Sequence, residues 1–474
     1  MSRVDFDAFA LHGVPAPELA LRHFDEPGVR VRYVDASPGW IDRVADALLE
    51  ARGALLARPA REVVGALGRV GARFLDPADP LRGEALALLP PTSGLSVGMA
   101  VAVLDGMARD WTGNRLLGLL RAELGDEAAL DGFAGARVGG RDAAMAVGPS
   151  LCVQIVAGSV PGVGVSALLR SLLVKGPTLV KPGRGDVVLP VLFARALREA
   201  DPALADALAV VYWPGGEPEL EDAALARADV VTAYGSDRTV ADLRSRTAVT
   251  ARFVAHHHRV SVGVVGRDAL TEQALETTAA GIAEAVALFD SRGCVSPQVV
   301  FVEEGSGAVP QRTGSAATFV AALAGALRRM EGSLPSGPLA AAEASELHQL
   351  RGTAELMAAA GDAELIHGGE APWTVVLEKG EGTLGSCAGR TIVVRAVSDV
   401  GEVPQVLAPL APHLQTVGVA GLGERLGDVA RALGRLGASR VVPFRSVAFP
   451  PPWWHHDGRG PLLDLLRWVD LEPE

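Results

Sequence analysis

Short apolar runs and one-sided apolar segments alternate along the chain from about residue 148 onward. The runs have the length of buried strands, and the segments between them carry apolar side chains at the three- and four-residue spacing of helices. This alternation predicts a parallel sheet covered by helices, and therefore an α/β fold. The first expected strands are SLCVQIVAG, TLVKP, LAVVYW and DVVTAYG, separated by the expected helices GVSALLRSLLVKG, VVLPVLFARALREA and ELEDAALARA.

The alternation continues to about residue 443, whereas both ends of the chain differ from it. The further expected strands are RVSVGVVG, PQVVFVEE, WTVVLE and RTIVVRAV, with helices at about 277–289, 315–330 and 340–360. Residues 1–145 are rich in Ala, Leu and Arg and predict mainly helices. After residue 443, the stretch PPPWWHHDGRG predicts a loop that leads into PLLDLLRWVDLE.

Length and composition narrow the class of protein. A chain of 474 residues is too long for one ordinary core, so two or more domains are expected. A net charge of -12 without a basic block argues against nucleic acid as a partner. No run of about 18 uncharged apolar residues occurs, so no membrane span is expected. The three cysteines, Cys152, Cys294 and Cys387, form neither a disulfide framework nor a metal-ligand spacing, which favours a reducing cytoplasm.

Two glycine-containing turns are candidates for phosphate binding. Gly162 begins the pattern G-x-G-x-x-A between an expected strand and an expected helix, where a dinucleotide fingerprint lies. The pattern is weak, because the chain has 55 glycines and no clean acidic residue follows about 20 positions later. Gly235 and Ser236 end a strand and begin a helix whose free N–H groups suit a phosphate. The alternative there is an ordinary helix cap by Ser236 or Asp237.

Several short motifs become informative when they are read in order: VAGSVPG, LVKPGRGD, AYGSD, HHHRVSVGVV, GCVSPQVVFVE, WTVVLE with RTIVVRAV, and HDGRGPLLDLLRWVDLE. Their order and spacing resemble the aldehyde dehydrogenase superfamily and, within it, the LuxC-type acyl-CoA reductases. The likeness runs from about residue 148 to the C-terminus, and the CVSPQ and HDG…LLRWVD blocks point to the reductase branch. Residues 1–145 match only vaguely.

The resemblance implies a Rossmann-type cofactor domain, an α/β catalytic domain and a small oligomerisation flap, and therefore a homo-oligomer. The corresponding ranges are 1–264 for the N-terminal helical region with the cofactor-binding domain, 265–443 for the catalytic domain, and 444–474 for the C-terminal return segment with the flap.

The resemblance also implies that Cys294 is the catalytic nucleophile. Its own backbone N–H would be one donor to the oxyanion. A turn between a helix and a strand gives such a thiol a fixed position, nearby backbone donors and an open face toward the cofactor. The alternative is an inert buried thiol, the commonest fate of a free cysteine. We interpret Cys152, inside a strand pattern, and Cys387 as structural.

The expected cofactor is NADPH. By the match, Lys181 ends the strand TLVK and points its ammonium at the adenine ribose, with Pro182 next to it. Dehydrogenases that prefer NAD often place a Glu three residues later, where this chain has Arg184. A guanidinium can hold a 2′-phosphate through two N–H groups. The alternative is an Arg184 that points to solvent.

The chain departs from the family pattern at three positions. Hydrolytic aldehyde dehydrogenases use a Glu to activate water where this chain aligns His256, so the acyl enzyme is expected to wait for hydride; His256, His257 or His258 could act as acid or base. A solvated loop is the alternative. Ser159 replaces the Asn expected as side-chain oxyanion donor. The Glu that often holds the nicotinamide ribose falls at about Ser386, so Glu378 is the nearest candidate, unless it is an ordinary strand-end charge.

The function that follows from the resemblance is the NADPH-dependent reduction of an acyl thioester to an aldehyde through an acyl group on Cys294. The acyl carrier is coenzyme A or an acyl-carrier protein. One alternative is an aldehyde or semialdehyde dehydrogenase that produces the acid, and the missing Glu argues against it. The other is a non-catalytic, acyl-accepting scaffold subunit, against which the GCVSPQ motif and Lys181 argue.

Overall fold

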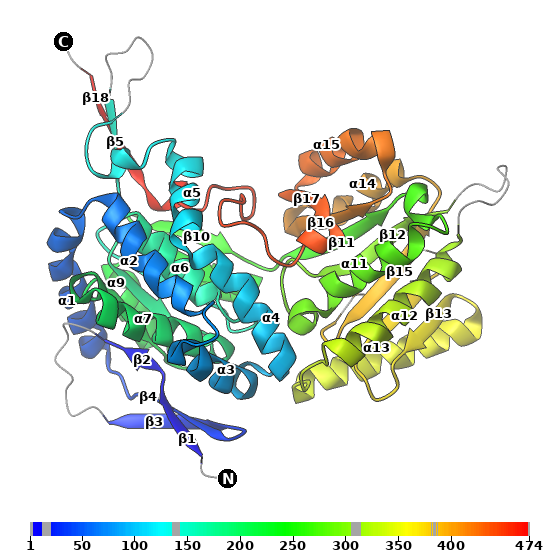
Figure 1. Cartoon of the computed structure of the whole chain (residues 1–474), viewed down its shortest axis with the longest axis horizontal. Helices are drawn as coiled ribbons and strands as arrows, with labels where there is room; N and C mark the ends of the chain where they lie inside the picture. The colour runs from blue at the N-terminus through cyan, green and yellow to red at the C-terminus, as the bar shows by residue number, and fades with distance from the viewer. Residues whose placement is uncertain are drawn as a thin grey trace.

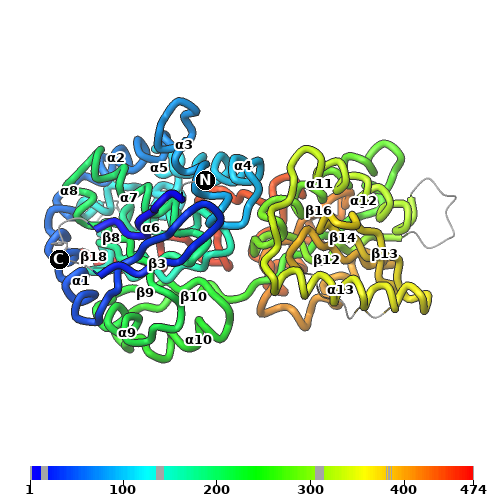
Figure 2. The backbone as a smooth tube through the Cα atoms, turned by 90° about the horizontal axis from the view of Figure 1, so that it is seen from below, coloured from blue at the N-terminus to red at the C-terminus, as the bar shows by residue number. Residues whose placement is uncertain are grey.

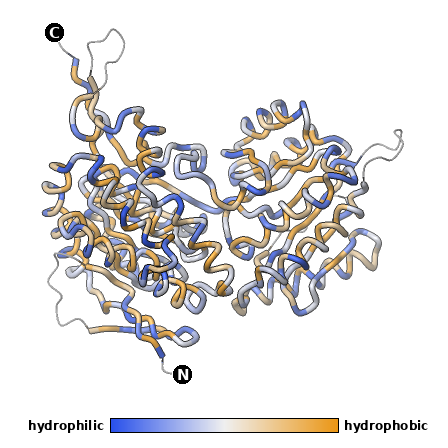
Figure 3. Tube along the Cα trace, viewed as in Figure 1, coloured by the Kyte–Doolittle hydropathy of each residue, from blue (hydrophilic) through white to orange (hydrophobic). Residues whose placement is uncertain are grey.

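The computed structural model describes residues 3–11, 20–134, 143–304, 314–380, 382, 385 and 387–472. The chain forms two lobes that lie side by side (Figure 1). The N-terminal half builds one lobe, the residues from about 260 build the other, and the last residues return to the first lobe. In both lobes the central strands are mainly hydrophobic, whereas hydrophilic residues gather on the outer helices (Figure 3).

A six-stranded sheet with the order β10-β9-β6-β7-β8-β2 forms the centre of the first lobe. All its neighbours are parallel except the short β2, which pairs antiparallel with β8. After the edge strand β2, the parallel strands begin at β6, run outward to β8 and return to β9, so the strand order reverses between β6 and β9. Ligands of such sheets bind outside the carboxyl ends of the strands at this reversal. The strands are β2 (Phe9–Ala10), β6 (Cys152–Ile155), β7 (Thr178–Lys181), β8 (Leu208–Val211), β9 (Val230–Tyr234) and β10 (Arg252–His256).

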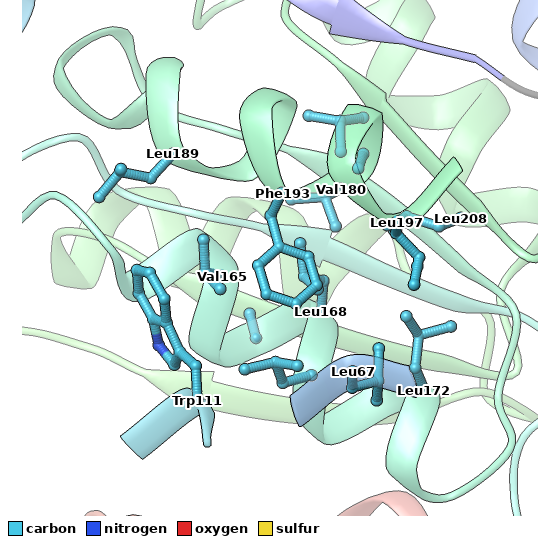
Figure 4. Close-up of a cluster of buried hydrophobic side chains, with 14 of the residues drawn as sticks. Leu67, Trp111, Val165, Leu168, Leu172, Val180, Leu189, Phe193, Leu197 and Leu208 are labelled. Carbon is cyan, nitrogen blue, oxygen red and sulfur yellow. The ribbon is translucent and has the colours of Figure 1, made fainter. Parts of the chain in front are cut away.

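Helices cover both faces of this sheet, as predicted. On one face, α6 and α7 pack on each other and on α2, and their apolar side chains meet around Phe193 and Trp111 (Figure 4). The two rings cross nearly edge to face, with centroids 6.3 Å apart. On the other face, α1 packs against α9. The helices are α1 (Pro38–Leu56), α2 (Ala60–Arg73), α6 (Val163–Leu173), α7 (Val188–Ala200) and α9 (Pro218–Arg227).

The N-terminal region contains helices, as predicted, but it begins with a small sheet that the sequence analysis did not predict. Strand β4 (Val29–Val34) lies between β1 (Val4–Asp7), which is parallel to it, and β3 (Leu21–Glu26), which is antiparallel. Its sequence VRVRYV alternates buried and partly exposed residues, the pattern of a half-buried strand. The remaining helices of the region are α3 (Pro80–Ser93), α4 (Val97–Ala108) and α5 (Gly113–Leu124).

In the described part of the chain, no single helix is long and apolar enough to cross a membrane. The helices Pro80–Ser93 and Val97–Trp111 reach the required length and composition only as a pair, and this pair is bent by 117°.

The second lobe is built on a seven-stranded sheet with the order β13-β14-β15-β12-β11-β16-β17. Its strands are parallel except for β13, an additional strand that the sequence analysis missed. Helices α11, α12 and α13 occupy the places predicted for helices. The strands are β11 (Val260–Val265), β12 (Pro297–Glu303), β13 (Ala363–His367), β14 (Thr374–Glu378), β15 (Thr391–Val397), β16 (Leu414–Ala420) and β17 (Arg440–Pro443), and the helices are α11 (Leu275–Ala287), α12 (Ala316–Ser333), α13 (Ala341–Ala360), α14 (Val403–Val406) and α15 (Leu426–Leu436).

The passage from one sheet to the other lies between β10 and β11. Because all of β11 belongs to the second sheet, this passage precedes the boundary predicted after residue 264. The C-terminal segment returns to the first lobe, where β18 (Arg467–Leu471) pairs antiparallel with β5 (Ala143–Val147). The predicted oligomerisation flap thus corresponds to the two-stranded sheet of β5 and β18. Of these two strands, only β18 lies within the predicted range 444–474. Self-association through it stays a prediction.

The turn that carries Cys294 has an unusual backbone. Phe289, Asp290 and Ser291 have φ angles of 61°, 50° and 61°, and all three are non-glycine residues in the left-handed region. Each such conformation costs roughly 1–3 kcal/mol, so surrounding contacts must hold the turn in place. The carbonyl of Cys294 accepts a hydrogen bond from Ser261 Oγ of β11 at 2.7 Å.

The side chain of Asp290 supplies the main contacts that hold the turn. Its Oδ1 accepts a hydrogen bond from Arg390 Nε at 2.8 Å, and its Oδ2 accepts one from the Gly337 N–H at 3.0 Å. Arg390 is fully buried and also binds Glu331 Oε2 at 2.8 Å. The position of Cys294 therefore depends on a charged pair in the interior of the second lobe.

Replacing Asp290 with Ala is expected to destabilise the second lobe and displace the thiol. The change leaves the Arg390 guanidinium buried with one carboxylate fewer, which costs about 3 kcal/mol. Urea unfolding followed by circular dichroism measures this loss. Glu276→Gln, which removes one partner of an exposed pair with Arg329, is the control and should cost under about 1 kcal/mol. Equal unfolding midpoints for wild type and Asp290→Ala would show that the pair does not stabilise the turn.

Candidate active site

A cavity of about 140 Å³ lies between the two lobes, with Cys294 in its wall. Residues of α4, α5 and α6 in the first lobe face the Cys294 turn and residues 448–456 across it. The wall is largely apolar, with side chains that include Met107, Trp111, Leu119, Val163, Phe449 and Trp454. A cavity of this composition suits an apolar chain whose reactive group lies at the thiol.

Cys294 is exposed, and it lines the cavity between the lobes, where protein surrounds its thiol on several sides. Its withdrawal from bulk water raises the pKa of the thiol to about 11, and the charge of Asp457 acts in the same direction. A hydrogen bond from the Gln415 side chain and the backbone N–H of Cys294 lower this pKa. The thiol is therefore protonated at neutral pH, and its proton must be removed before it can attack a carbonyl carbon.

Beside the thiol, the buried carboxylate of Asp457 is the centre of a polar network. It binds His256 Nδ1 at 2.9 Å and Gln415 Nε2 at 2.8 Å, and it forms an ion pair with Arg259 Nε at 2.9 Å. Burial raises the pKa of Asp457, but the hydrogen bond to His256 and the other partners outweigh this effect and hold the pKa far below its usual range. The carboxylate therefore stays ionised and is a weak base.

Four stacked rings form a column next to this carboxylate. Tyr234, His256, His456 and Trp454 follow one another with centroids 4.4, 4.2 and 4.7 Å apart. Burial lowers the pKa of His256, and it lowers that of His456 well below the ordinary value. Both imidazoles are therefore neutral at neutral pH, and the contact with Asp457 favours the proton of His256 on Nδ1.

His256 and His456 differ in the cavities that their rings line. His456 lines the cavity that contains Cys294, whereas both rings line an adjacent pocket of about 20 Å³. Of the three consecutive histidines considered as acid or base, only His256 enters the buried network. His257 and His258 lie toward the surface, near Asp237 and His413.

Sequence reasoning assigned no role to Gln415, His456, Asp457 or Arg259. His456 and Asp457 lie in the HDG motif, which marks the family without indicating their partners, whereas Gln415 lies in β16 without a motif of its own. Asp457 is 201 positions away from His256 in the chain. Nothing in the local pattern around either residue indicates that the two meet.

Ser159, the predicted side-chain oxyanion donor, lies in the loop between β6 and α6 and is exposed. The next residue, Val160, lines the Cys294 cavity. In the parts of the chain that the structure describes, the Ser159 hydroxyl makes no hydrogen bond. It is therefore available near the cavity, and its role as a donor stays a prediction.

Glu378 is poorly placed for the catalytic or ribose-binding role predicted for it. It ends β14, whereas Cys294 precedes the start of β12, and both strands run parallel to β15. The two residues therefore lie at opposite edges of the sheet. Glu378 is buried, and its Oε2 accepts a hydrogen bond from Arg395 Nε at 2.8 Å. This placement favours the alternative, a structural charge at a strand end. Ser386 lies outside the described residues.

The carboxyl end of β7 carries the predicted ribose-binding residues. Lys181 is buried, burial lowers its pKa, and its ammonium lies 5.9 Å from the centre of the Tyr212 ring. Within the described residues its ammonium makes no hydrogen bond, so it can bind a hydroxyl group. Pro182 is buried next to it. Arg184 is exposed but not free, because its Nε binds Glu26 Oε1 at 2.8 Å.

The G-x-G-x-x-A turn is already occupied by a side chain of the protein. The carboxylate of the buried Asp186 accepts hydrogen bonds from the N–H groups of Gly162 and Gly164, both at 2.7 Å. Burial raises the pKa of Asp186 to about 7, although the two donors lower it. Because these two N–H groups are engaged, they are not open to a phosphate, and the weak fingerprint does not act as one here.

The second turn keeps its helix N-terminus at the surface. Ser236 is exposed and caps α10 (Asp237–Arg246), with its Oγ accepting a hydrogen bond from the Thr239 N–H at 3.2 Å. The preceding Gly235 donates its N–H to the carbonyl of His256 at 3.1 Å. The ordinary cap considered as the alternative is therefore present. Phosphate binding by Gly235 and Ser236 stays a prediction.

The other two cysteines lie apart from the Cys294 cavity. Cys152 is fully buried in β6, where burial raises the pKa of its thiol to about 12. Cys387 is half-buried, and its Sγ lies 3.5 Å from Thr391 Oγ1. Both placements agree with the structural role predicted for these residues.

Solved structures show the fold to which this arrangement belongs. An aldehyde dehydrogenase from Physcomitrella patens has a TM-score of 0.76 and 15% identity, covering 99% of this chain and 98% of that one. Aldehyde dehydrogenase C from Pseudomonas syringae, in complex with NAD+ and octanal, has a TM-score of 0.73 and 16% identity, covering 100% and 98%. The chain therefore has the aldehyde dehydrogenase fold.

Sequence comparison shows the family. The long-chain acyl-protein thioester reductase of Aliivibrio fischeri is 24% identical over 323 residues, which are 68% of this chain and 63% of that protein. The corresponding reductase of Vibrio harveyi is 24% identical over 152 residues, 31% of each chain. The matches thus span less than two thirds of these relatives. The sequence model described as "Acyl-CoA reductase (LuxC)" matches residues 56–468. Because this match covers most of the chain, the protein belongs to the acyl-CoA reductase (LuxC) family.

Proposed function

We propose that the protein reduces an acyl thioester to an aldehyde with NADPH, through an acyl group carried on Cys294. The observation that carries this proposal is the exposure of Cys294 in the wall of an apolar cavity between the two lobes. The family and the names of the relatives, which are long-chain acyl-protein thioester reductases, support the choice of a thioester. The carrier that delivers the acyl group is coenzyme A or an acyl-carrier protein.

The first half of the reaction transfers the acyl group to the protein. Cys294 Sγ forms a bond to the thioester carbonyl carbon, the bond from this carbon to the carrier sulfur breaks, and the thiol proton goes to the departing carrier. Because the pKa of the Cys294 thiol is about 11, a nearby group must accept its proton first. His456 lines the cavity and stacks on His256, which Asp457 orients. We assign the role of proton acceptor to His456, the neutral imidazole that shares the cavity with the thiol; His256 and Asp457 hold its ring in place through the stack.

The second half uses the cofactor. Lys181, Pro182 and Arg184 at the end of β7 would hold its ribose, and the α10 N-terminus at Gly235 and Ser236 would hold its phosphates. The fit rests on Lys181, a buried cation at the carboxyl edge of the sheet whose ammonium makes no hydrogen bond in the described residues. When bound, the nicotinamide supplies hydride to the acyl carbon. The thiohemiacetal oxyanion on Cys294 then collapses to the aldehyde and the thiolate, and the thiolate takes up a proton from solvent to restore the thiol.

The same site disfavours hydrolysis. The position that carries a water-activating Glu in hydrolytic aldehyde dehydrogenases is His256, which is held by Asp457. The nearby carboxylate, Asp457, is a weak base because its partners hold its pKa far below the usual range. Water in the cavity therefore lacks a strong base, and the acyl group persists until hydride arrives.

Cys294→Ala is expected to abolish acylation. After incubation with decanoyl-CoA and no cofactor, intact-protein mass spectrometry should show one decanoyl group on the wild type and none on the variant. Cys387→Ala, which removes another accessible thiol, is the matched control and should be acylated like the wild type. An adduct that persists on Cys294→Ala would assign the nucleophile to another residue.

Asp457→Asn is expected to have opposite effects on the thiol and on the reaction. Removing the negative charge lowers the pKa of Cys294, so iodoacetamide at pH 8 should alkylate it faster. Removing the charged partner of His256 loosens the ring stack that positions His456, so kcat for decanoyl-CoA reduction should fall by roughly a hundredfold or more. Asp428→Asn, which changes an exposed carboxylate on α15, is the control. Slower alkylation in Asp457→Asn would contradict the electrostatic part of this argument.

Arg184→Glu is expected to reverse the choice of cofactor. A guanidinium bound to the 2′-phosphate contributes about 1.5–3 kcal/mol, or roughly a tenfold to hundredfold preference for NADPH. A carboxylate at this position repels the phosphate. The measurement is the ratio of kcat/KM for NADPH and NADH in both proteins. If the ratio is the same in both, Arg184 does not contact the phosphate.

A further inference from the structure

We propose that Glu26, in the N-terminal sheet, sets how strongly the protein distinguishes NADPH from NADH. This inference rests on the proposed binding of the cofactor ribose at the end of β7. Its motivation is the pair between Glu26 and Arg184, in which Glu26 Oε1 lies 2.8 Å from both Nε and an Nη of the guanidinium. The residue expected to hold a 2′-phosphate thus already has an anionic partner.

The end of β7 is the ribose position on structural grounds. β7 is the neighbour of β6 on one side of the point where the strand order reverses. In sheets of this type, the group that contacts the ribose 2′ position lies at the end of the strand that follows the first turn and helix, about 20 residues after the turn. Here that strand is β7 and the residues are Lys181–Arg184; this placement depends on the order of the strands and not on phosphate binding by the Gly162 turn, which Asp186 fills. An acidic side chain there binds the 2′-hydroxyl of NADH, whereas an arginine accommodates the phosphate of NADPH.

Aromatic rings next to Glu26 pack against Arg184 and hold the hairpin at the ribose position. Phe24 of the same strand lies under the Arg184 guanidinium, 4.4 Å from ring centre to Cζ, and packs on Tyr212 with centroids 5.4 Å apart. The Lys181 ammonium lies 5.9 Å from the same Tyr212 ring. Figure 2 shows the N-terminal strands lying across the first lobe, close to β8. The β3–β4 hairpin thus forms one side of the ribose position.

This side of the site comes from a segment outside the family match. The family's sequence model begins at residue 56, whereas β3 ends at Glu26. Lys181 and Arg184 lie within the matched region, so that region of this chain contributes two cations and the preceding hairpin contributes the anion. Three residues after Lys181, this chain has Arg184 in place of a Glu. Glu26 places a carboxylate against the Arg184 guanidinium.

The carboxylate affects the two cofactors differently. To bind a 2′-phosphate, Arg184 must exchange Glu26 for the phosphate while the carboxylate stays close to a group with about two negative charges. The Glu26 side chain is only 19% exposed, so solvent screens this repulsion incompletely. A 2′-hydroxyl can instead donate a hydrogen bond to the same carboxylate. Glu26 therefore opposes NADPH and favours NADH, and it limits the preference that Arg184 produces.

The decisive experiment measures the dissociation constants of NADPH and NADH by isothermal titration calorimetry, without an acyl substrate. Glu26→Gln keeps the shape of the side chain and removes its charge. It is expected to tighten NADPH binding about tenfold, equivalent to about 1.4 kcal/mol, and to leave NADH binding unchanged or weaker. Circular dichroism confirms that the variant is folded.

The matched control is Asp25→Asn. Asp25 precedes Glu26 on β3, carries the same charge and pairs with Arg3 and Arg30 instead. Its removal should change the NADPH-to-NADH ratio less than twofold. A ratio that shifts equally in both variants would reveal a general charge effect and overturn the proposal, as would an unchanged ratio in Glu26→Gln.

A second background separates this inference from the proposed function. In Arg184→Gln, the added Glu26→Gln change should give a smaller gain for NADPH than it gives in the wild type, because the competition for the guanidinium is gone and only the repulsion of the phosphate is left to relieve. If Arg184→Glu reverses the preference while Glu26→Gln has no effect, the role of Glu26 is wrong and the cofactor site stands. If wild type binds neither nucleotide, the proposed function fails and the role of Glu26 fails with it.

Discussion

The arrangement of the site depends on one buried carboxylate. Asp457 comes from the C-terminal return segment, yet its partners are His256 at the end of β10, Arg259 in the passage between the sheets, and Gln415 on β16. These partners belong to both lobes and to the segment that connects them. A buried ion with this many partners is strongly destabilised when one partner is lost, so the network favours a single relative position of the lobes and of the Cys294 cavity between them.

The polar network and the apolar cavity divide the chemical tasks of the site. The cavity offers little to a charged ligand beyond a few polar groups, whereas its apolar wall can bury the chain of an acyl group. His456 and Cys294 are two of its polar groups, and Asp110 and Arg170 of the first lobe are others. Removal from water keeps the thiol protonated and the imidazoles neutral, so proton transfer has to occur between groups that are held in contact rather than through solvent.

The cofactor side of the molecule illustrates how one side chain can replace a ligand. The Asp186 carboxylate accepts hydrogen bonds from the N–H groups of Gly162 and Gly164 in the first glycine turn. Because the carboxylate occupies these donors, it excludes a phosphate from the turn. The α10 N-terminus at Ser236 is exposed by comparison. At the end of β7, Glu26 similarly binds the guanidinium of Arg184. In both places a protein carboxylate lies where the sequence motif alone indicates a phosphate.

The sequence by itself determined the α/β class, most strands and helices of both sheets, and the place of Cys294 between α11 and β12, because these features depend on local hydrophobic periodicity and on short motifs. It did not determine β1, β3 and β4, whose short alternating runs stand in a region of mainly helical composition. Only the tertiary structure decided that His256 meets Asp457, that Arg184 meets Glu26, and that Glu378 lies away from the thiol. Contacts such as these join residues up to 201 positions apart. Local pattern carries no information about them, because packing of the two sheets and the returning C-terminal segment brings the partners together.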